Sequence, residues 1–290
     1  MLQSNAQSYK IDKLLSNQKD DHFNFDRVEV INSFFPNYFK IESYFEQISS
    51  INPTEDGSKY SSNIVFRSDI QARGDTGNIL RLIFLTEPAR LLTERFMSEV
   101  NDVAIAWDAR GESPYGSKEA LLMRRLDSYL DSNDDCNFMV RELNRYEKGY
   151  GHPSERACLE VAKKALSKNF HGIGISERLP ETLFWFCSLL NFEQVPPVSG
   201  DFIQKYDGLP DFQDLPMKTK KKIHKRTQLD RKIYEEAHEE LDRICGKMDP
   251  RGGLSSFKKQ LIFAPEWRLR ENASSVLEQV ADFEARLQEI

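Results

Sequence analysis

The sequence predicts a three-layer α/β/α domain with a mostly parallel sheet, and two segments carry this prediction. In the first, the nearly continuous apolar run Ile79–Leu85 leads directly into a segment whose apolar residues have helical spacing. In the second, the glycine-containing strand Phe170–Ser176 leads into a helix that Pro180 opens. A strand without a polar face suits a parallel sheet that helices cover on both sides. Two such strand-to-helix units therefore favour the layered α/β class.

Composition and length indicate one domain with a substantial core and a short tail. Hydrophobic residues make up 39% and aromatic residues 11% of the 290-residue chain, which is enough for a substantial core and excludes wholesale disorder. We expect one α/β domain over residues 1–248 and a C-terminal tail over residues 249–290, with a break at Gly252-Gly253. The tail ends in an amphipathic segment from about Ser274, which predicts a helix that docks on its own domain or on a partner.

Charge and cysteine usage exclude several protein classes. Forty basic residues against 46 acidic residues give a net charge of −6, which argues against a generic nucleic-acid coat. The four cysteines are far apart and form no CxxC pair, so we interpret them as reduced core residues and expect no metal site. No apolar run reaches the roughly 18–20 residues that span a bilayer, and the N-terminus lacks a signal-peptide pattern. We expect a soluble, cytoplasmic protein without a membrane span.

The turn after the Ile79–Leu85 run is the most informative local feature. Thr86, Glu87 and Pro88 predict a strand end, a helix cap and a proline at the first helical position. The first amide hydrogens of a helix lack partners within the helix. A strand that runs straight into a helix start is therefore suited to bind an anion such as a phosphate.

The remaining elements are predicted in chain order. Val28–Phe35 fits either a helix or a strand. Helices are expected over residues 117–131 and 154–169, each with an apolar stripe, and the helix after Pro180 is apolar all round and therefore buried. Residues 193–216 predict a loop, which continues through a basic run to residue 226. Thr227 and Asp230 then resemble a capping box at the start of a last regular helix, which ends near residue 248.

This order of features resembles the PAPS-dependent sulfotransferases, in particular the carbohydrate sulfotransferases of the heparan sulfate 2-O type. The segments that carry the resemblance are FLTEPARLLTERF (84–96), NFMVRELN (137–144), residues 159–193 and residues 218–241. The resemblance covers roughly residues 60–245 and implies a fold like that of the P-loop nucleotide-binding proteins. It also implies transfer of a sulfonate from PAPS to a hydroxyl of a saccharide or small metabolite, with PAP as the desulfonated donor.

The resemblance implies a glycine-rich phosphate loop with a lysine near the N-terminus. By position, the counterpart is YKIDKLLS (9–16), which supplies Lys13 and Ser16 as donor-binding residues and Lys13 as the cation on the bridging oxygen. This segment departs from the family pattern, because leucines stand where glycines are expected and the first 56 residues contain no glycine. Leucine side chains obstruct the close backbone approach that a phosphate requires.

The second donor site implied by the resemblance holds the 3′-phosphate through an arginine and a serine. Thr86 stands where the arginine is expected, and the serine position falls on Glu94, or on Thr93 if one residue is deleted. Arg90 and Arg95 could replace the missing cation. The alternative is that both arginines are solvated helix charges.

A general base for the acceptor hydroxyl is expected in the segment NIVFRSDI (63–70), where relatives of the 2-O type use a histidine. This segment contains no histidine, so Asp69 is the candidate base. An exposed loop aspartate without a catalytic role is the alternative. None of the five histidines has a partner at metal-ligand spacing.

The basic run Lys218–Arg226 carries six cations in nine residues of an acidic protein. In the enzyme hypothesis, Lys220, Lys221 and Lys222 contact the nucleotide. In the second hypothesis, the protein is a catalytically inactive sulfotransferase-fold protein, and the run binds a protein or another anionic partner. A third interpretation is a solvated loop, which the following acidic residues balance: Glu235, Glu236, Glu239 and Glu240.

Overall fold

The computed structural model describes residues 27–32, 34, 41–51, 64–67, 79–96, 118–131, 136–147, 154–190, 192, 215–249 and 253–260. The predictions for Lys13, Ser16 and Asp69, and the tail segment from Ser274, lie outside the described residues.

Four parallel strands form the sheet, in the order β2-β1-β3-β4. They are β1 (Arg27–Ile31), β2 (Ile64–Arg67), β3 (Ile79–Leu85) and β4 (Gly172–Ile175). Register pairs Val28 of β1 with Ile64 on one side and Leu80 on the other, and Leu82 of β3 with Gly172 of β4. The predicted α/β class with a parallel sheet is confirmed, and the ambiguous segment after residue 27 is a strand.

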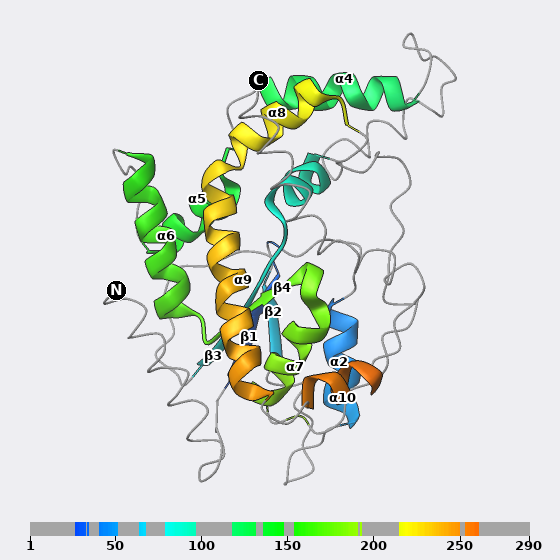
Figure 1. Cartoon of the computed structure of the whole chain (residues 1–290), viewed down its shortest axis with the longest axis vertical. Helices are drawn as coiled ribbons and strands as arrows, with labels where there is room; N and C mark the ends of the chain where they lie inside the picture. The colour runs from blue at the N-terminus through cyan, green and yellow to red at the C-terminus, as the bar shows by residue number, and fades with distance from the viewer. Residues whose placement is uncertain are drawn as a thin grey trace.

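Helices pack against this sheet or against one another (Figure 1). In chain order they are α2 (Ile41–Ile51), a helix over residues 88–96, α4 (Lys118–Asp131), α5 (Phe138–Glu147), α6 (Glu155–Asn169), α7 (Leu179–Leu189), α8 (Met217–Arg226), α9 (Gln228–Met248) and α10 (Gly253–Gln260). The helices predicted near 117–131 and 154–169 are confirmed, and the Ser154 hydroxyl caps α6 by accepting the N–H of Ala157 at 3.2 Å. As expected for a helix that is apolar all round, α7 is buried along most of its length.

Two glycines of β4 let α7 lie close to the sheet. A Cβ at Gly172 would lie 2.9 Å from Phe186 Cε1 of α7, and a Cβ at Gly174 would overlap the methyl group of Thr182. The Thr182 hydroxyl accepts the N–H of Ile175 at 2.8 Å and donates to its carbonyl at 3.0 Å. The end of β4 and the first turn of α7 are thereby fixed against each other.

The close contact at Gly174 predicts that a larger residue there destabilises the protein. Gly174→Ala is expected to lower the free energy of unfolding by about 2 kcal/mol, because overpacking a well-filled core costs about 1–3 kcal/mol. Gly246→Ala in α9 is the matched control, since a Cβ there meets nothing within 4 Å. The control should gain up to about 1 kcal/mol from the helix propensity of alanine. Urea unfolding measures both, and equal stability of the two variants would contradict the packing argument.

The basic run Lys218–Arg226 is helix α8, so its prediction as a loop is wrong. Thr219, Ile223 and Arg226 are buried and lie on one face of this helix. An apolar cluster joins α8 to α4 and to the helix over residues 88–96; its buried members are Ala89, Leu92, Phe96, Leu122, Leu126, Leu130, Leu215 and Ile223. The density of lysines hid this helical pattern, although lysine is itself a good helix former.

Thr227 and Asp230 do not form the predicted capping box. The Thr227 hydroxyl donates to the carbonyl of Ile223 at 3.0 Å. The Asp230 carboxylate instead accepts the N–H groups of Met139 at 3.2 Å and Val140 at 2.9 Å, so it caps α5. Asn137, at a φ of 51°, returns the contact by accepting the N–H of Leu229 at 2.8 Å. The amino ends of α5 and α9 thus cap each other.

All four cysteines are free, with Cys187 and Cys245 buried and Cys136 and Cys158 half-buried. Burial raises the pKa of the Cys187 thiol to about 12. Within the ranges given above, no three His, Cys, Asp or Glu side chains gather as metal ligands would. None of the described helices is both long enough and apolar enough to cross a membrane.

Candidate functional site at the carboxyl edge of the sheet

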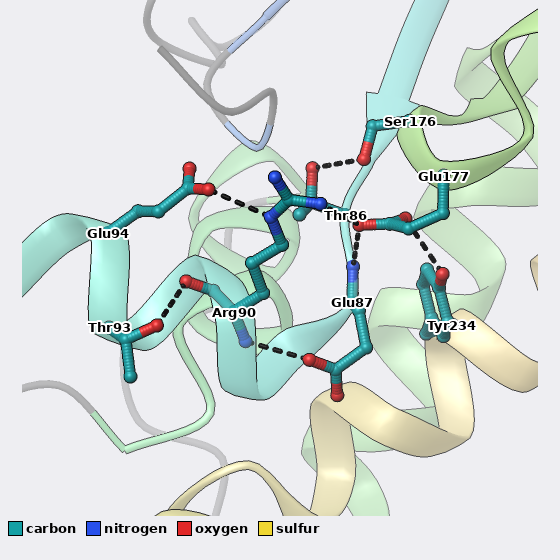
Figure 2. A network of polar contacts seen from close by, with 8 residues as sticks. All are labelled: Thr86, Glu87, Arg90, Thr93, Glu94, Ser176, Glu177 and Tyr234. Carbon is teal, nitrogen blue, oxygen red and sulfur yellow. Dashed lines mark hydrogen bonds and ion pairs between the residues drawn. The ribbon is translucent and has the colours of Figure 1, made fainter. Parts of the chain in front are cut away.

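The carboxyl ends of β3 and β4 meet at one edge of the sheet, because the two strands are parallel neighbours. Thr86 and Glu87 follow β3, and Ser176 and Glu177 follow β4. Ligands of open α/β sheets bind beyond the carboxyl ends of the strands. Figure 2 shows the polar network at this edge, which is the candidate functional site.

The two hydroxyl groups of this network bond to each other. Thr86 Oγ1 and Ser176 Oγ lie 2.8 Å apart, and both residues are fully buried. The structure therefore places Thr86, the residue predicted to replace a phosphate-binding arginine, beneath the surface and in contact with the end of β4.

Glu87 caps the helix over residues 88–96. Its Oε2 accepts the N–H of Arg90 at 2.7 Å, which confirms the predicted helix cap, and the residue is 7% exposed. Burial raises the pKa of the Glu87 carboxyl, while the N–H groups of Arg90 and Ala89 act to lower it. The helix start that could accept an external anion thus already holds the carboxyl group of Glu87, which occupies the N–H of Arg90.

Glu177 joins three elements at this edge. Its Oε1 accepts the backbone N–H of Glu87 at 3.2 Å, and its Oε2 accepts the hydroxyl of Tyr234 on α9 at 2.8 Å (Figure 2). Arg90 Nη1 lies 3.9 Å from Oε1. A second acidic side chain thus contacts both the turn after β3 and the helix that follows it.

Arg90 and Thr93, both predicted to bind the donor, lie on the first turns of the same helix. Arg90 Nε donates to Glu94 Oε1 at 2.9 Å, so its guanidinium lies between the carboxylates of Glu94 and Glu177 (Figure 2). The Thr93 hydroxyl donates to the carbonyl of Arg90 at 2.9 Å. The structure brings Thr86, Arg90 and Thr93 to one edge, but surrounds the arginine with acidic groups that oppose a phosphate.

The other predicted cations lie on different surfaces. The Arg95 guanidinium stacks on Phe138, 3.6 Å from the ring centroid. Lys222 Nζ faces α4, at 2.8 Å from Asp131 Oδ1 and 3.5 Å from Asp127 Oδ1. Lys220 is half-buried and Lys221 is exposed on α8. The network of Figure 2 includes none of these four basic residues.

Sequence reasoning missed Ser176, Glu177 and Tyr234. A signal for the first two was present, since a hydroxyl residue followed by glutamate comes directly after both β3 and β4. Neighbouring parallel strands bring such matched dipeptides together. Tyr234 had no comparable signal, because its contact with Glu177 spans 57 residues.

A second polar cluster lies on a sheet face and was also missed. Glu29 on β1 is 4% exposed and accepts from three guanidinium groups. The distances are 2.8 Å to Arg27 Nη2, 3.1 Å to Arg67 Nη2 and 2.9 Å to Arg81 Nε. One carboxylate thus links β1, β2 and β3 across the sheet.

Comparison with known proteins finds no relative that assigns a function to these sites. None of the protein-family models matches the chain, and none of the curated proteins matches it.

Proposed function

We propose that this protein has a three-layer, sulfotransferase-like scaffold but acts by binding an anionic partner rather than by transferring a sulfonate. The observation that carries the proposal is the Glu87 carboxylate on the helix start after β3. Amides at a helix start bind a phosphate when they are available to it. Here the N–H of Arg90 is bonded to Glu87, and the N–H of Glu87 is bonded to Glu177.

The binding element in this proposal is α8. Its apolar face is buried against α4 and the helix over residues 88–96, so the fold already uses that side. Lys218, Lys221 and Lys225 are exposed on the other side. The protein carries a net charge of −6, so a long polyanion is repelled by most of its surface. A short anionic partner that contacts only this positive helix face avoids that repulsion.

The second candidate function is the PAPS-dependent sulfotransferase. It is favoured by the placement of Arg90 and Thr93 on a helix that starts at the carboxyl edge of a parallel sheet. This candidate requires Arg90 to exchange Glu94 and Glu177 for a phosphate. It also requires Lys13, Ser16 and Asp69, together with the lysines of α8, to complete the donor and acceptor sites.

Calorimetric titration with PAP separates the two candidates. We expect no saturable binding at millimolar PAP at low or moderate salt, because the carboxylates around Arg90 repel the nucleotide phosphates. Micromolar binding that Arg90→Ala abolishes and Arg124→Ala leaves unchanged would overturn the proposal in favour of the enzyme. Arg124 is an exposed arginine of α4 and serves as the matched control.

A binding assay on the same protein tests the positive half of the proposal. A short glutamate-rich peptide and a sulfated oligosaccharide, each immobilised, are the two anionic probes. Salt-dependent retention on at least one of them, lost when Lys218, Lys221 and Lys225 are all changed to Glu, supports an anionic partner at α8. Retention on neither probe at low salt would overturn it.

A further inference from the structure

We infer that the exposed face of α8 docks an acidic helical segment of a partner protein. This inference rests on the proposed function and adds the chemical class of the partner.

The spacing of three lysines matches the repeat of an α-helix. Lys218, Lys221 and Lys225 are separated by three and four residues, so their side chains lie along one stripe of α8, about 10 Å long at 1.5 Å per residue. All three are exposed. Among the described residues, the side chains of these three lysines form no hydrogen bond or ion pair, although Asp131 of α4 interacts electrostatically with Lys218 as well as with its closer partner Lys222. A partner helix with carboxylates at the same spacing places one carboxylate opposite each lysine.

The stripe is held in a fixed direction by the rest of the domain. Lys222 of the same helix pairs with Asp127 and Asp131 of α4, which lies beside α8 (Figure 1). At the other end, the carbonyl of Arg226 accepts the N–H of Asn137 at 2.7 Å. A surface that is ordered before binding loses less conformational entropy when the partner docks.

An exposed methionine favours a protein over a glycan or a nucleic acid. Met217 is 50% exposed at the start of α8, and Ile51 is the other large apolar residue exposed in the described ranges. Met217 lies next to Lys218 and one turn before Lys221. Burying a thioether side chain requires an apolar group on the partner, and methionine is common at adaptable protein-binding surfaces. A sulfated sugar or a phosphate backbone offers mainly anionic groups to this end of the stripe.

The net charge of the protein also favours a short acidic protein segment over a long polyanion. At −6, the protein as a whole repels a long polyanion, whereas a short acidic segment carries only the charges that the lysines match.

The test uses three fluorescently labelled probes and the full chain. The first is a helical peptide with three glutamates at the spacing of the lysines and one leucine a turn before the first glutamate. The second has the same composition and helix content, with the glutamates spread around the helix. The third is a sulfated oligosaccharide. Fluorescence anisotropy at low salt should show the first peptide binding about tenfold tighter than the second, since three ion pairs of 0.5 kcal/mol or more add up to that factor.

Charge-reversal variants locate the surface. Lys218→Glu, Lys221→Glu and Lys225→Glu together should weaken binding of the first peptide by tenfold or more. The matched control changes Lys164, Lys168 and Lys232, exposed lysines of α6 and α9, to Glu, with the same change in net charge. The control should change binding by less than about threefold, and circular dichroism should show both proteins folded.

The outcomes separate this inference from the proposed function. Equal binding of the two peptides, or equal loss in both variants, overturns the helical-partner inference. Tighter binding of the oligosaccharide than of either peptide, lost in the α8 variant, also overturns it while the proposed function stands. Absence of binding to all three probes overturns both.

Discussion

Glu29→Ala is expected to lower the free energy of unfolding by about 3–4 kcal/mol. Arg27, Arg67 and Arg81 share this buried carboxylate across three strands. Its removal leaves three guanidinium groups close together without their common counter-charge, and loss of one partner of a buried ion pair costs about 3–5 kcal/mol. We place the expected loss toward the lower end, because the arginine side chains are 19–31% exposed and solvent screens part of the repulsion.

Chemical unfolding with urea measures this effect. Glu46→Ala on α2 is the matched control, since Glu46 is exposed and its substitution should cost less than about 0.5 kcal/mol. Glu29→Gln keeps the shape of the side chain and removes the charge, so it isolates the electrostatic part of the loss. A loss below 1 kcal/mol for Glu29→Ala would contradict a central role for this carboxylate in the sheet.

Asp230→Ala is expected to cost about 3 kcal/mol, because it leaves two buried N–H groups of α5 without acceptors. Each unsatisfied buried donor costs about 1–3 kcal/mol. Asp230 is 3% exposed and accepts from Met139 and Val140. Asp230→Asn retains one acceptor oxygen and nearly the same volume, so it should cost less than the alanine variant.

The same residue makes stability depend on pH. Burial raises the pKa of the Asp230 carboxyl to about 7, against an ordinary value of 3.8; the N–H groups of Val140 and Met139 oppose the shift, as does the charge of Arg141. Between these values the folded protein binds a proton that the unfolded chain has released. The stabilisation from this group is therefore complete below about pH 4 and is lost as pH rises through about 7.

The free energy of unfolding, measured from pH 4.5 to 8, should show this loss in the difference between wild type and Asp230→Asn. The difference should fall by up to about 1.4 kcal/mol per pH unit in the middle of the window. Asp230→Asn serves as the reference because burial also raises the pKa of Glu87, which is unchanged in both proteins. A constant or rising difference would show that the folded carboxyl is not held in its protonated form.

Local patterns predicted the parts of the fold that depend on neighbouring residues. The Ile79–Leu85 strand, the cap at Glu87 and the helix predicted over residues 154–169 each depend on residues a few positions apart. The order of the strands and the identity of β2 depend on long-range pairing, and no local pattern specified them.

The errors have the same physical origin. Asp230 has the spacing of a capping box with Thr227, but a helix start 91 residues away in the chain is its partner. The dense lysines of α8 suggested a loop, because the sequence does not show which segments cover the apolar face of this helix. Those segments are α4 and the helix over residues 88–96, which are distant in the chain. At the carboxyl edge, Thr86, Arg90 and Thr93 lie in one place, as their positions predicted. The carboxylate of Glu177, which makes that place acidic, comes from the turn after β4.

The mutual capping of α5 and α9 also bears on the order in which the chain can assemble. Each helix lacks an acceptor for its first amides until the other is in place, and about 90 residues separate them. Those residues include α6, β4 and α7, so forming the contact closes a long loop, and the entropy cost of closure grows only slowly with loop length. Since β4 lies inside this loop and pairs with β3, the same stretch of chain supplies the edge strand of the sheet and joins the two helices that cap each other.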